Sequence, residues 1–292
     1  MSNGNTKGTM PDQPAPLERA SLAYENREFI DSPDGRLLRI IAEYQEPLAR
    51  FRRERIADTI VFFGSARFHS DENETPHSIP RTTAVYYEDA RTLARMVSTW
   101  AKTLPGPRHR FVVTSGGGPG IMEAANRGAW EAGARSIGLN IKLTHEQEPN
   151  RYITPALNFE FHYFFMRKYW FAYLAKALVV FPGGFGTLDE LFEIMTLAQT
   201  NKLAKKIIVI LYGTSYWRQL LNFDFLVAQG AISAEDLALF RFVDTPEEAL
   251  AHLKEGLEAH MHAAPEFPEH VPNTPAPTAQ DLLGPDIART LP

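Results

Sequence analysis

The chain has 292 residues, enough for one large domain or two small ones. Its net charge of −5 argues against non-specific nucleic-acid binding, and the absence of cysteine excludes disulfides, a thiolate nucleophile and Cys-ligated metals. No apolar run has membrane-spanning length, and the first residues carry no secretory signal pattern. We therefore expect a cytoplasmic protein with neither nucleic acid nor membrane among its partners.

Composition divides the chain into four parts. Residues 1–16 are polar and rich in Gly and Pro, which predicts a disordered tail, and residues 263–292 are predicted to form a second, Pro-rich tail. Between residues 17 and 57 apolar side chains recur at helical spacing, which predicts an N-terminal helical extension that Pro47 breaks or kinks. Residues 58–262 form the predicted core domain.

The core domain alternates short apolar strands with helices. Strands are predicted at residues 59–63, 109–114, 136–141, 177–181 and 206–211. Helices are predicted at residues 82–103, 120–132, 162–175, 186–201, 215–229 and 246–261. This alternation indicates an α/β fold, a Rossmann-like doubly wound parallel sheet with flanking helices. Right-handed crossovers place the strand-to-helix turns on one edge of such a sheet, where ligands bind.

The strongest functional signal is a glycine-rich turn, Pro182-Gly-Gly-Phe-Gly-Thr187, between a predicted strand and a predicted helix. Backbone amides at such a turn can bind an anion at the helix N-terminus. The predicted phosphate ligands are Gly183, Gly184, Gly186 and Thr187. No lysine follows the last glycine, and the dinucleotide fingerprint is absent, which argues against triphosphate hydrolysis and a nicotinamide cofactor. Glu190 either acts beside the bound anion or forms a capping box with Thr187.

An earlier turn, Thr114-Ser-Gly-Gly-Gly-Pro-Gly120, has the same setting. Gly117 and Gly118 are predicted to contact the ligand, because three consecutive glycines are costly in a purely structural loop. Glu123 either contacts the ligand or only complements the dipole of the helix that it begins. Ser65 follows the first strand and either donates to a phosphate or ribose oxygen or belongs to an ordinary turn.

The segment Phe164-Phe-Met-Arg-Lys-Tyr-Trp-Phe171 predicts a buried helix, since aromatic residues surround it. Arg167 and Lys168 need partners there, because an unpaired buried cation is costly. They form either a structural ion pair or a contact with phosphate or sugar beside Glu190. The aromatic group Tyr163–Phe165 either stacks on a base or packs in the core.

These motifs together resemble the LOG ("Lonely Guy") family, whose members have also been called lysine decarboxylase-like. The 182–190 segment matches the pattern PGGxGTxxE, Arg167 and Lys168 match the Arg-Lys pair upstream of it, and Phe63-Gly-Ser65 and Gly116-Gly-Gly118 fall in the expected order. The resemblance covers about residues 58–230. Glu123 stands where shorter plant-type members have glycine, and the terminal extensions are typical of a longer bacterial branch.

The resemblance implies a phosphoribohydrolase, which cleaves the N-glycosidic bond of a nucleoside 5′-monophosphate to give free base and ribose 5-phosphate. AMP and cytokinin ribotides are the implied substrates. Arg167 and Glu190 become the implied catalytic pair, and the chain is expected to form a homodimer or a larger homo-oligomer.

The sequence leaves two alternative functions open. The chain could instead be a carrier that holds a phosphorylated cofactor without hydrolysis, as a related molybdenum-cofactor carrier does, or a nucleosidase that prefers pyrimidine monophosphates. No metal-ligand cluster is visible in the sequence. We therefore expect no obligatory metal and no cofactor.

Overall fold

The computed structural model describes residues 19–70, 81–143, 148–200, 202 and 206–261. Contacts divide the chain into two units, with the boundary between Ala42 and Glu43. The first unit contains α1 (Arg27–Asp31) and the start of α2 (Arg36–Arg53). Both predicted tails, 1–16 and 263–292, lie outside the described residues, so they stay predictions.

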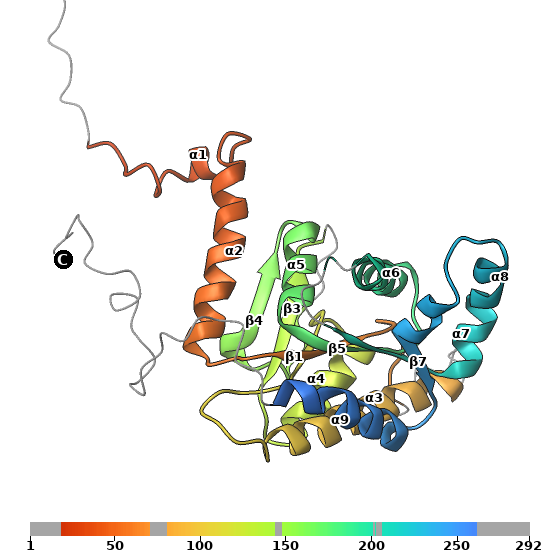
Figure 1. Cartoon of the computed structure of the whole chain (residues 1–292). Coiled ribbons are helices and arrows are strands. Elements are labelled where there is room, and N and C mark those ends of the chain that lie inside the picture. The colour runs from red at the N-terminus through yellow and green to blue at the C-terminus, as the bar shows by residue number, and fades with distance from the viewer. Residues whose placement is uncertain (1–18, 71–80, 144–147, 201, 203–205, 262–292) are drawn as a thin grey trace, which may run out of the picture. The chain divides into compact units, whose positions relative to one another are not determined.

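The second unit is built on one parallel sheet of seven strands in the order β4-β3-β2-β1-β5-β6-β7 (Figure 1). The strands are β1 (Thr59–Phe63), β2 (Val112–Ser115), β3 (Ser136–Ile141), β4 (Asn158–Phe161), β5 (Ala175–Val180), β6 (Ile208–Tyr212) and β7 (Phe240–Val243). Every neighbouring pair is parallel. The central strands are unbroken apolar runs that are buried on both faces, as strands of a covered parallel sheet must be.

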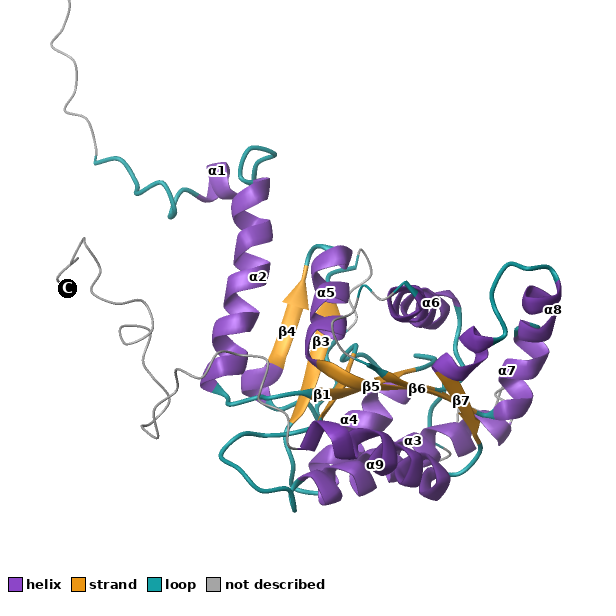
Figure 2. Ribbon diagram, viewed as in Figure 1, coloured by secondary structure: helices purple, strands orange, loops and turns teal. Residues whose placement is uncertain are grey.

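Helices cover both faces of this sheet (Figure 2). They are α3 (Arg81–Ala101), α4 (Ile121–Glu131), α5 (Phe164–Leu174), α6 (Phe185–Gln199), α7 (Thr214–Leu220), α8 (Phe223–Ala228) and α9 (Pro246–Met261), with short 3₁₀ turns at Pro155–Leu157 and Glu235–Leu239. In both ribbon views α3, α4 and α9 lie on one side of the sheet, and α5 and α6 lie on the other. The predicted fold class, a doubly wound Rossmann-like α/β sheet, is confirmed.

The main core lies between the sheet and α3, α4 and α9. Inward-facing residues of four strands, among them Ile60, Val113, Val179 and Ile210, are fully buried against alanines and leucines of these helices. On the other face, the ring of Phe63 meets that of Phe171 from α5 edge-on, with centroids 4.9 Å apart. Burial on both faces fixes the register of the strands, and thereby the place where each strand ends.

Strand order reverses between β1 and β5. The chain builds β2, β3 and β4 on one side of β1, then returns to place β5 on its other side. Ligand sites of open α/β sheets form in the crevice outside the carboxyl ends of the strands at such a point. Here those ends lead into the Gly64–Ser65 turn and the Pro182–Thr187 turn, which are joined by a hydrogen bond from the Ser65 amide to the Pro182 carbonyl (3.0 Å).

Pro47 was predicted to break or kink the N-terminal helical segment, and the structure rules out the break, because α2 continues through it. A helical proline leaves the carbonyl four residues earlier without its donor. That carbonyl belongs to Glu43, and the indole Nε1 of Trp170 donates to it at 2.9 Å. The carboxylate of Glu43 accepts the amides of His162 (2.7 Å) and Tyr163 (3.2 Å), just before α5. A tertiary contact thus replaces the missing helical hydrogen bond.

Three further differences concern the ends of the sheet. The edge strands β4 (Asn158–Phe161) and β7 (Phe240–Val243) were not predicted, because each is short and exposes every second residue or more. The helix predicted at residues 215–229 consists of two helices, α7 and α8, separated at Leu221 and Asn222. The Asn222 side chain accepts the Phe225 amide and begins the second helix.

Candidate functional site

A cleft of about 680 Å³ opens at the carboxyl ends of β1 and β5. It lies where the reversal of strand order predicts a ligand site. Its lining is Phe63–Phe68, Gly116, Met122, Asn140, Ile141, Leu143, Phe164, Arg167, Phe171, Gly183–Thr187, Glu190 and Tyr216. The glycine-rich turn and the Arg167–Glu190 pair, which are apart in sequence, therefore share one cavity.

The 182–187 turn leads directly into α6. The helix begins at Phe185 with Gly184 as its N-cap, and no side chain caps it. The capping-box alternative is therefore wrong: Thr187 lies inside the first turn rather than at the cap. A Cβ on Gly183 would lie 2.2 Å from Thr187 Oγ1, so only glycine fits there. A Cβ on Gly184 or Gly186 would meet no protein atom within 4 Å, so packing does not require glycine at either position.

The amides of this turn are available to a ligand. Within the described part of the chain, the backbone N–H groups of residues 183–187 have no acceptor in the protein. The carbonyls of the same turn are all engaged: Pro182 accepts from the Ser65 amide, Gly183 from the Tyr216 hydroxyl (2.8 Å) and Gly184 from the Leu188 amide (3.0 Å). Five free donors at the N-terminus of a fifteen-residue helix favour an anion.

Arg167 and Glu190 both line the cleft and are in contact with each other. Arg167 Nη2 donates to Glu190 Oε1 at 3.2 Å, and the two side chains are only 14% and 6% exposed. The guanidinium also lies over the rings of Phe164 and Phe171, at 5.2 and 5.6 Å from their centroids. Among the described residues, its buried Nε has no hydrogen-bond partner. One long contact and an unpaired donor leave this guanidinium free to bind a further oxygen.

Burial controls the charge of the pair. It raises the pKa of Glu190 to about 7, because the charged form loses water, and the positive charge of Arg167 opposes this rise without cancelling it. Burial also lowers the pKa of Arg167, against the pull of Glu190. A carboxyl group that titrates near neutral pH beside an anion site has the properties of an acid–base or charge-stabilising group.

Ser65 lines the cleft, and its predicted contact with a ligand stays a prediction. Its amide bonds to Pro182, and its hydroxyl accepts the amide of Arg67 at 3.1 Å. The hydroxyl proton can still be donated to a ligand.

The first glycine turn is used mainly by the protein itself. Gly116 lines the cleft, whereas Gly117 and Gly118 are buried outside its lining. The Asn150 side chain donates to the carbonyls of Gly117 (3.0 Å) and Gly118 (3.1 Å), and the Gly117 amide donates to Ser115 Oγ (3.1 Å). These contacts fix the turn that carries Gly116 to the cleft.

Glu123 and Lys168 lie outside the cleft lining. Glu123 Oε1 accepts the hydroxyl of Tyr87 at 3.0 Å. Lys168 bonds to Asp189 (2.8 Å) and Glu193 (3.1 Å), on the outer side of α6. Their predicted ligand contacts stay predictions, and the distances show other partners for both.

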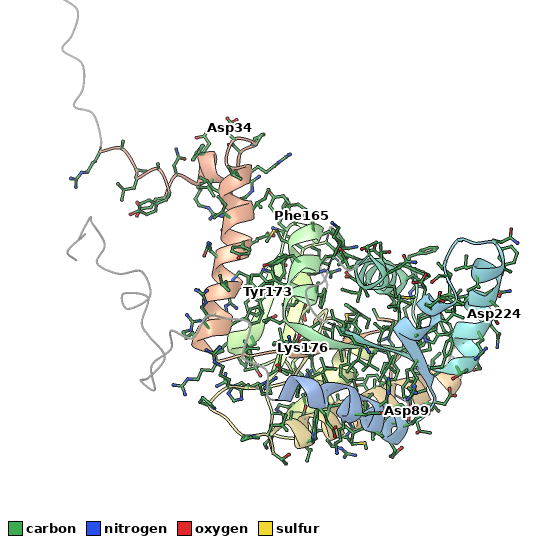
Figure 3. The ribbon with its side chains drawn as sticks, viewed as in Figure 1. Asp34, Asp89, Phe165, Tyr173, Lys176 and Asp224 are labelled. Carbon is green, nitrogen blue, oxygen red and sulfur yellow. The ribbon has the colours of Figure 1, made fainter. Side chains whose placement is uncertain are left out.

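The aromatic group at the start of α5 divides between cleft and surface. Phe164 lines the cleft, but Tyr163 and Phe165 do not. Figure 3 shows Phe165 at one end of α5 and Tyr173 towards the other. Phe164 and Phe165 are both exposed.

Sequence reasoning missed two residues that shape the site. Tyr216 lines the cleft from α7 and donates a hydrogen bond to the second glycine turn. Asn150 donates to carbonyls of the first glycine turn. Neither residue belongs to a recognisable motif, and both are distant in sequence from the turns that they hold.

The described residues contain no group of three or more His, Cys, Asp or Glu that could hold a metal ion, and no helix with the length and apolarity to cross a bilayer. The expected absence of a metal and of a membrane partner stays a prediction.

Comparison with known proteins finds one family of relatives. Residues 122–253 match the family model described as "Possible lysine decarboxylase". The chain is also similar to curated proteins named as LOG phosphoribohydrolases. A probable cytokinin riboside 5′-monophosphate phosphoribohydrolase of Oryza sativa subsp. japonica, LOGL3, is 29% identical over 52% of this chain and 72% of its own. The Arabidopsis thaliana enzyme of the same activity named LOG3 is 28% identical over 54% of this chain and 73% of its own.

A solved structure is also similar to this chain. The molybdenum cofactor carrier protein of Chlamydomonas reinhardtii is 18% identical, with 68% of this chain and 98% of that chain covered and a TM-score of 0.41. A likeness of this degree has no bearing on function. The evidence for chemistry therefore comes from the named relatives and from the site itself.

Proposed function

We propose that this protein hydrolyses the N-glycosidic bond of nucleoside 5′-monophosphates and releases free base and ribose 5-phosphate. The observation that carries the proposal is the juxtaposition, in one cleft, of five free amides at residues 183–187 with the buried Arg167–Glu190 pair. The names of the LOG relatives describe this type of reaction on cytokinin ribotides. AMP and cytokinin ribotides are the proposed substrates.

In this proposal the phosphate is the handle of the substrate. The amides of the 183–187 turn bind the phosphate, with the positive end of α6 directed at it. Binding energy at this remote group fixes the ribose beside Glu190, which lies one helical turn further along α6. A nucleoside without phosphate lacks the handle and is expected to react poorly.

Glu190 and Arg167 act on the ribose. Cleavage of the C–N bond builds positive charge on the sugar ring, and the Glu190 carboxylate stabilises that charge and orients the attacking water. Water supplies the hydroxyl group to C1′ and a proton to the departing base. The unpaired Nε of Arg167 donates to a sugar or phosphate oxygen.

A panel of purine and pyrimidine nucleoside monophosphates, scored for released base, tests the reaction and its base preference. We expect release from AMP and much slower release from adenosine. Equal rates for AMP and adenosine would refute the phosphate handle. Tight binding of a nucleotide without any release would instead indicate a carrier.

A substitution at Glu190 tests the assignment of the carboxylate. Glu190→Gln removes the charge and keeps the shape, so we expect substrate binding to persist while turnover falls by about 10²–10⁴-fold. The matched control is Glu193→Gln, which changes the same chemical group one turn further along α6, outside the cleft. Near-normal turnover in Glu190→Gln would remove this residue from the mechanism.

A further inference from the structure

Tyr216 is the side chain that holds the middle peptide of the phosphate turn. Its hydroxyl donates to the carbonyl of Gly183 at 2.8 Å, from a helix that starts after β6 and so comes from a different crossover. The residue is half-buried and lines the cleft. No other described group donates to this carbonyl.

The direction of this carbonyl determines the direction of an amide. In a trans peptide the C=O and the following N–H point in opposite directions, because the unit is planar. With the Gly183 carbonyl directed at Tyr216, the Gly184 amide points away from Tyr216. A flipped peptide would reverse both groups and present a carbonyl oxygen to an anion in place of a donor.

The glycines make such a flip accessible. A flip of the 183–184 peptide carries φ of Gly184 from its observed −88° to a positive value, which glycine alone adopts readily. The flanking peptides are held by backbone donors, since Pro182 accepts from Ser65 and Gly184 accepts from Leu188. Among the described residues, only the phenol of Tyr216 donates to the carbonyl of the middle peptide.

We propose that Tyr216 is a positioning residue, which latches the Gly183–Gly184 peptide in the orientation that donates to phosphate. This inference rests on the proposed function. It assigns a role to a residue outside the glycine motif and predicts that α7 takes part in recognition of the phosphate group.

The test is phosphate affinity, measured by calorimetric titration of the full chain with inorganic phosphate and with ribose 5-phosphate. Tyr216→Phe removes one hydroxyl group and keeps the ring. We expect both ligands to bind about fivefold more weakly, the effect of losing about one hydrogen bond. In turnover of AMP the KM rises by a similar factor while kcat stays within about twofold, because the reacting groups are untouched.

Tyr212→Phe is the matched control. The Tyr212 hydroxyl donates to Asp89 Oδ2 at 2.9 Å, outside the cleft lining, so this variant loses a comparable hydrogen bond without touching the turn. We expect its phosphate affinity to equal that of the unmodified chain. An equal loss of affinity in both variants would attribute the effect to stability and overturn the latch.

A second variant separates the latch from a direct contact with the ligand. Gly184→Ala penalises the flipped peptide, and a Cβ there meets no protein atom within 4 Å. If Tyr216 acts by preventing the flip, Tyr216→Phe weakens phosphate binding less in the Gly184→Ala background than in the unmodified chain. An undiminished effect would overturn the latch and indicate a direct contact.

The outcomes for the two proposals differ. Failure of the unmodified chain to bind phosphate would overturn the phosphate handle, and the latch with it. Phosphate binding that Tyr216→Phe leaves unchanged would overturn the latch alone.

Discussion

Glu190 owes its chemical character to its position rather than to its partner. The carboxyl group is 6% exposed and receives one contact of 3.2 Å from Arg167. A strong ion pair lowers the pKa of a carboxyl group, but here loss of solvation outweighs the pairing and holds that pKa at about 7. The same carboxyl group on an exposed face of α6 would be fully ionised at neutral pH and of little use in acid–base chemistry.

This pKa predicts a pH dependence of turnover. In the proposed mechanism the carboxylate is the active form, so kcat/KM for AMP should fall about tenfold per pH unit below about 7 and level off above it. The second ionisation of the substrate phosphate has a pKa of about 6. The fall in kcat/KM that it causes therefore lies at lower pH than the fall caused by protonation of Glu190. A kcat/KM profile measured over pH 5–9 gives the comparison.

Glu193→Gln is the control for the profile: the negative charge of Glu193 contributes to the raised pKa of Glu190, so the acid limb should persist and move slightly to lower pH. An acid limb of kcat/KM that lies at or below the pKa of the phosphate in the unmodified chain would contradict the assignment of Glu190.

Arg167 and Lys168 are adjacent in sequence but have different surroundings. Neighbouring residues on a helix point about 100° apart, so Arg167 faces the cleft while Lys168 bonds to Asp189 on the outer side of α6.

Helix α2 illustrates how tertiary contacts override a local signal. Pro47 reads as a helix breaker in sequence, yet the helix continues because Trp170 supplies a donor to the Glu43 carbonyl. That donor lies more than a hundred positions away, so no local pattern contains it. The alternating strands and helices of the core were predictable for the opposite reason: their apolar runs and glycine turns are local.

A double-mutant cycle tests the replacement of this hydrogen bond. Trp170→Phe leaves the partly buried Glu43 carbonyl without a donor and removes buried volume, so we expect a loss of about 2–4 kcal/mol in the free energy of unfolding. In the Pro47→Ala background the new amide can bond to Glu43, so the loss should shrink by about 1 kcal/mol. Urea unfolding of the four proteins measures both values. Strict additivity would show that the indole contributes only packing.

The glycine turns mark the limit of what a motif reveals. The 182–187 turn could be singled out as a candidate anion site, because its glycines follow a strand and precede a helix. Its supports were not: Ser65 and Tyr216 reach it from other crossovers. The first turn carries a similar glycine pattern, yet Asn150 occupies the carbonyls of Gly117 and Gly118. Only the packed fold separates a turn that faces a ligand from one that faces the protein.

At the scale of the whole molecule, three exposed phenylalanines lie at the cleft or at a groove on α6. Phe164 and Phe185 line the cleft, and Phe185 and Phe192 line an adjoining shallow groove on α6. All three are exposed, Phe185 by 91%. Contiguous exposed aromatic residues mark interaction sites in soluble proteins. This surface supports the expectation that the chain forms a homodimer or a larger homo-oligomer.

Light scattering coupled to gel filtration tests the association. We expect the unmodified chain to elute as an oligomer and Phe192→Glu to shift it towards the monomer, because a buried charge in an apolar contact is costly. The control is Phe225→Glu, which places the same charge on another exposed phenylalanine, on α8. A monomer in the unmodified chain, or an equal shift in both variants, would contradict this role for the α6 surface.

The contacts of Glu43 also limit how far the chain can be truncated from its N-terminus. Its carboxylate receives the amides that precede α5, and Tyr44 and Phe51 of the same helix pack against Trp170. The match to the family model starts at residue 122, and the first strand starts at Thr59. Recombinant fragments trimmed to either boundary would strip the helix that carries Arg167 of its support, so a minimal active fragment has to begin before Glu43.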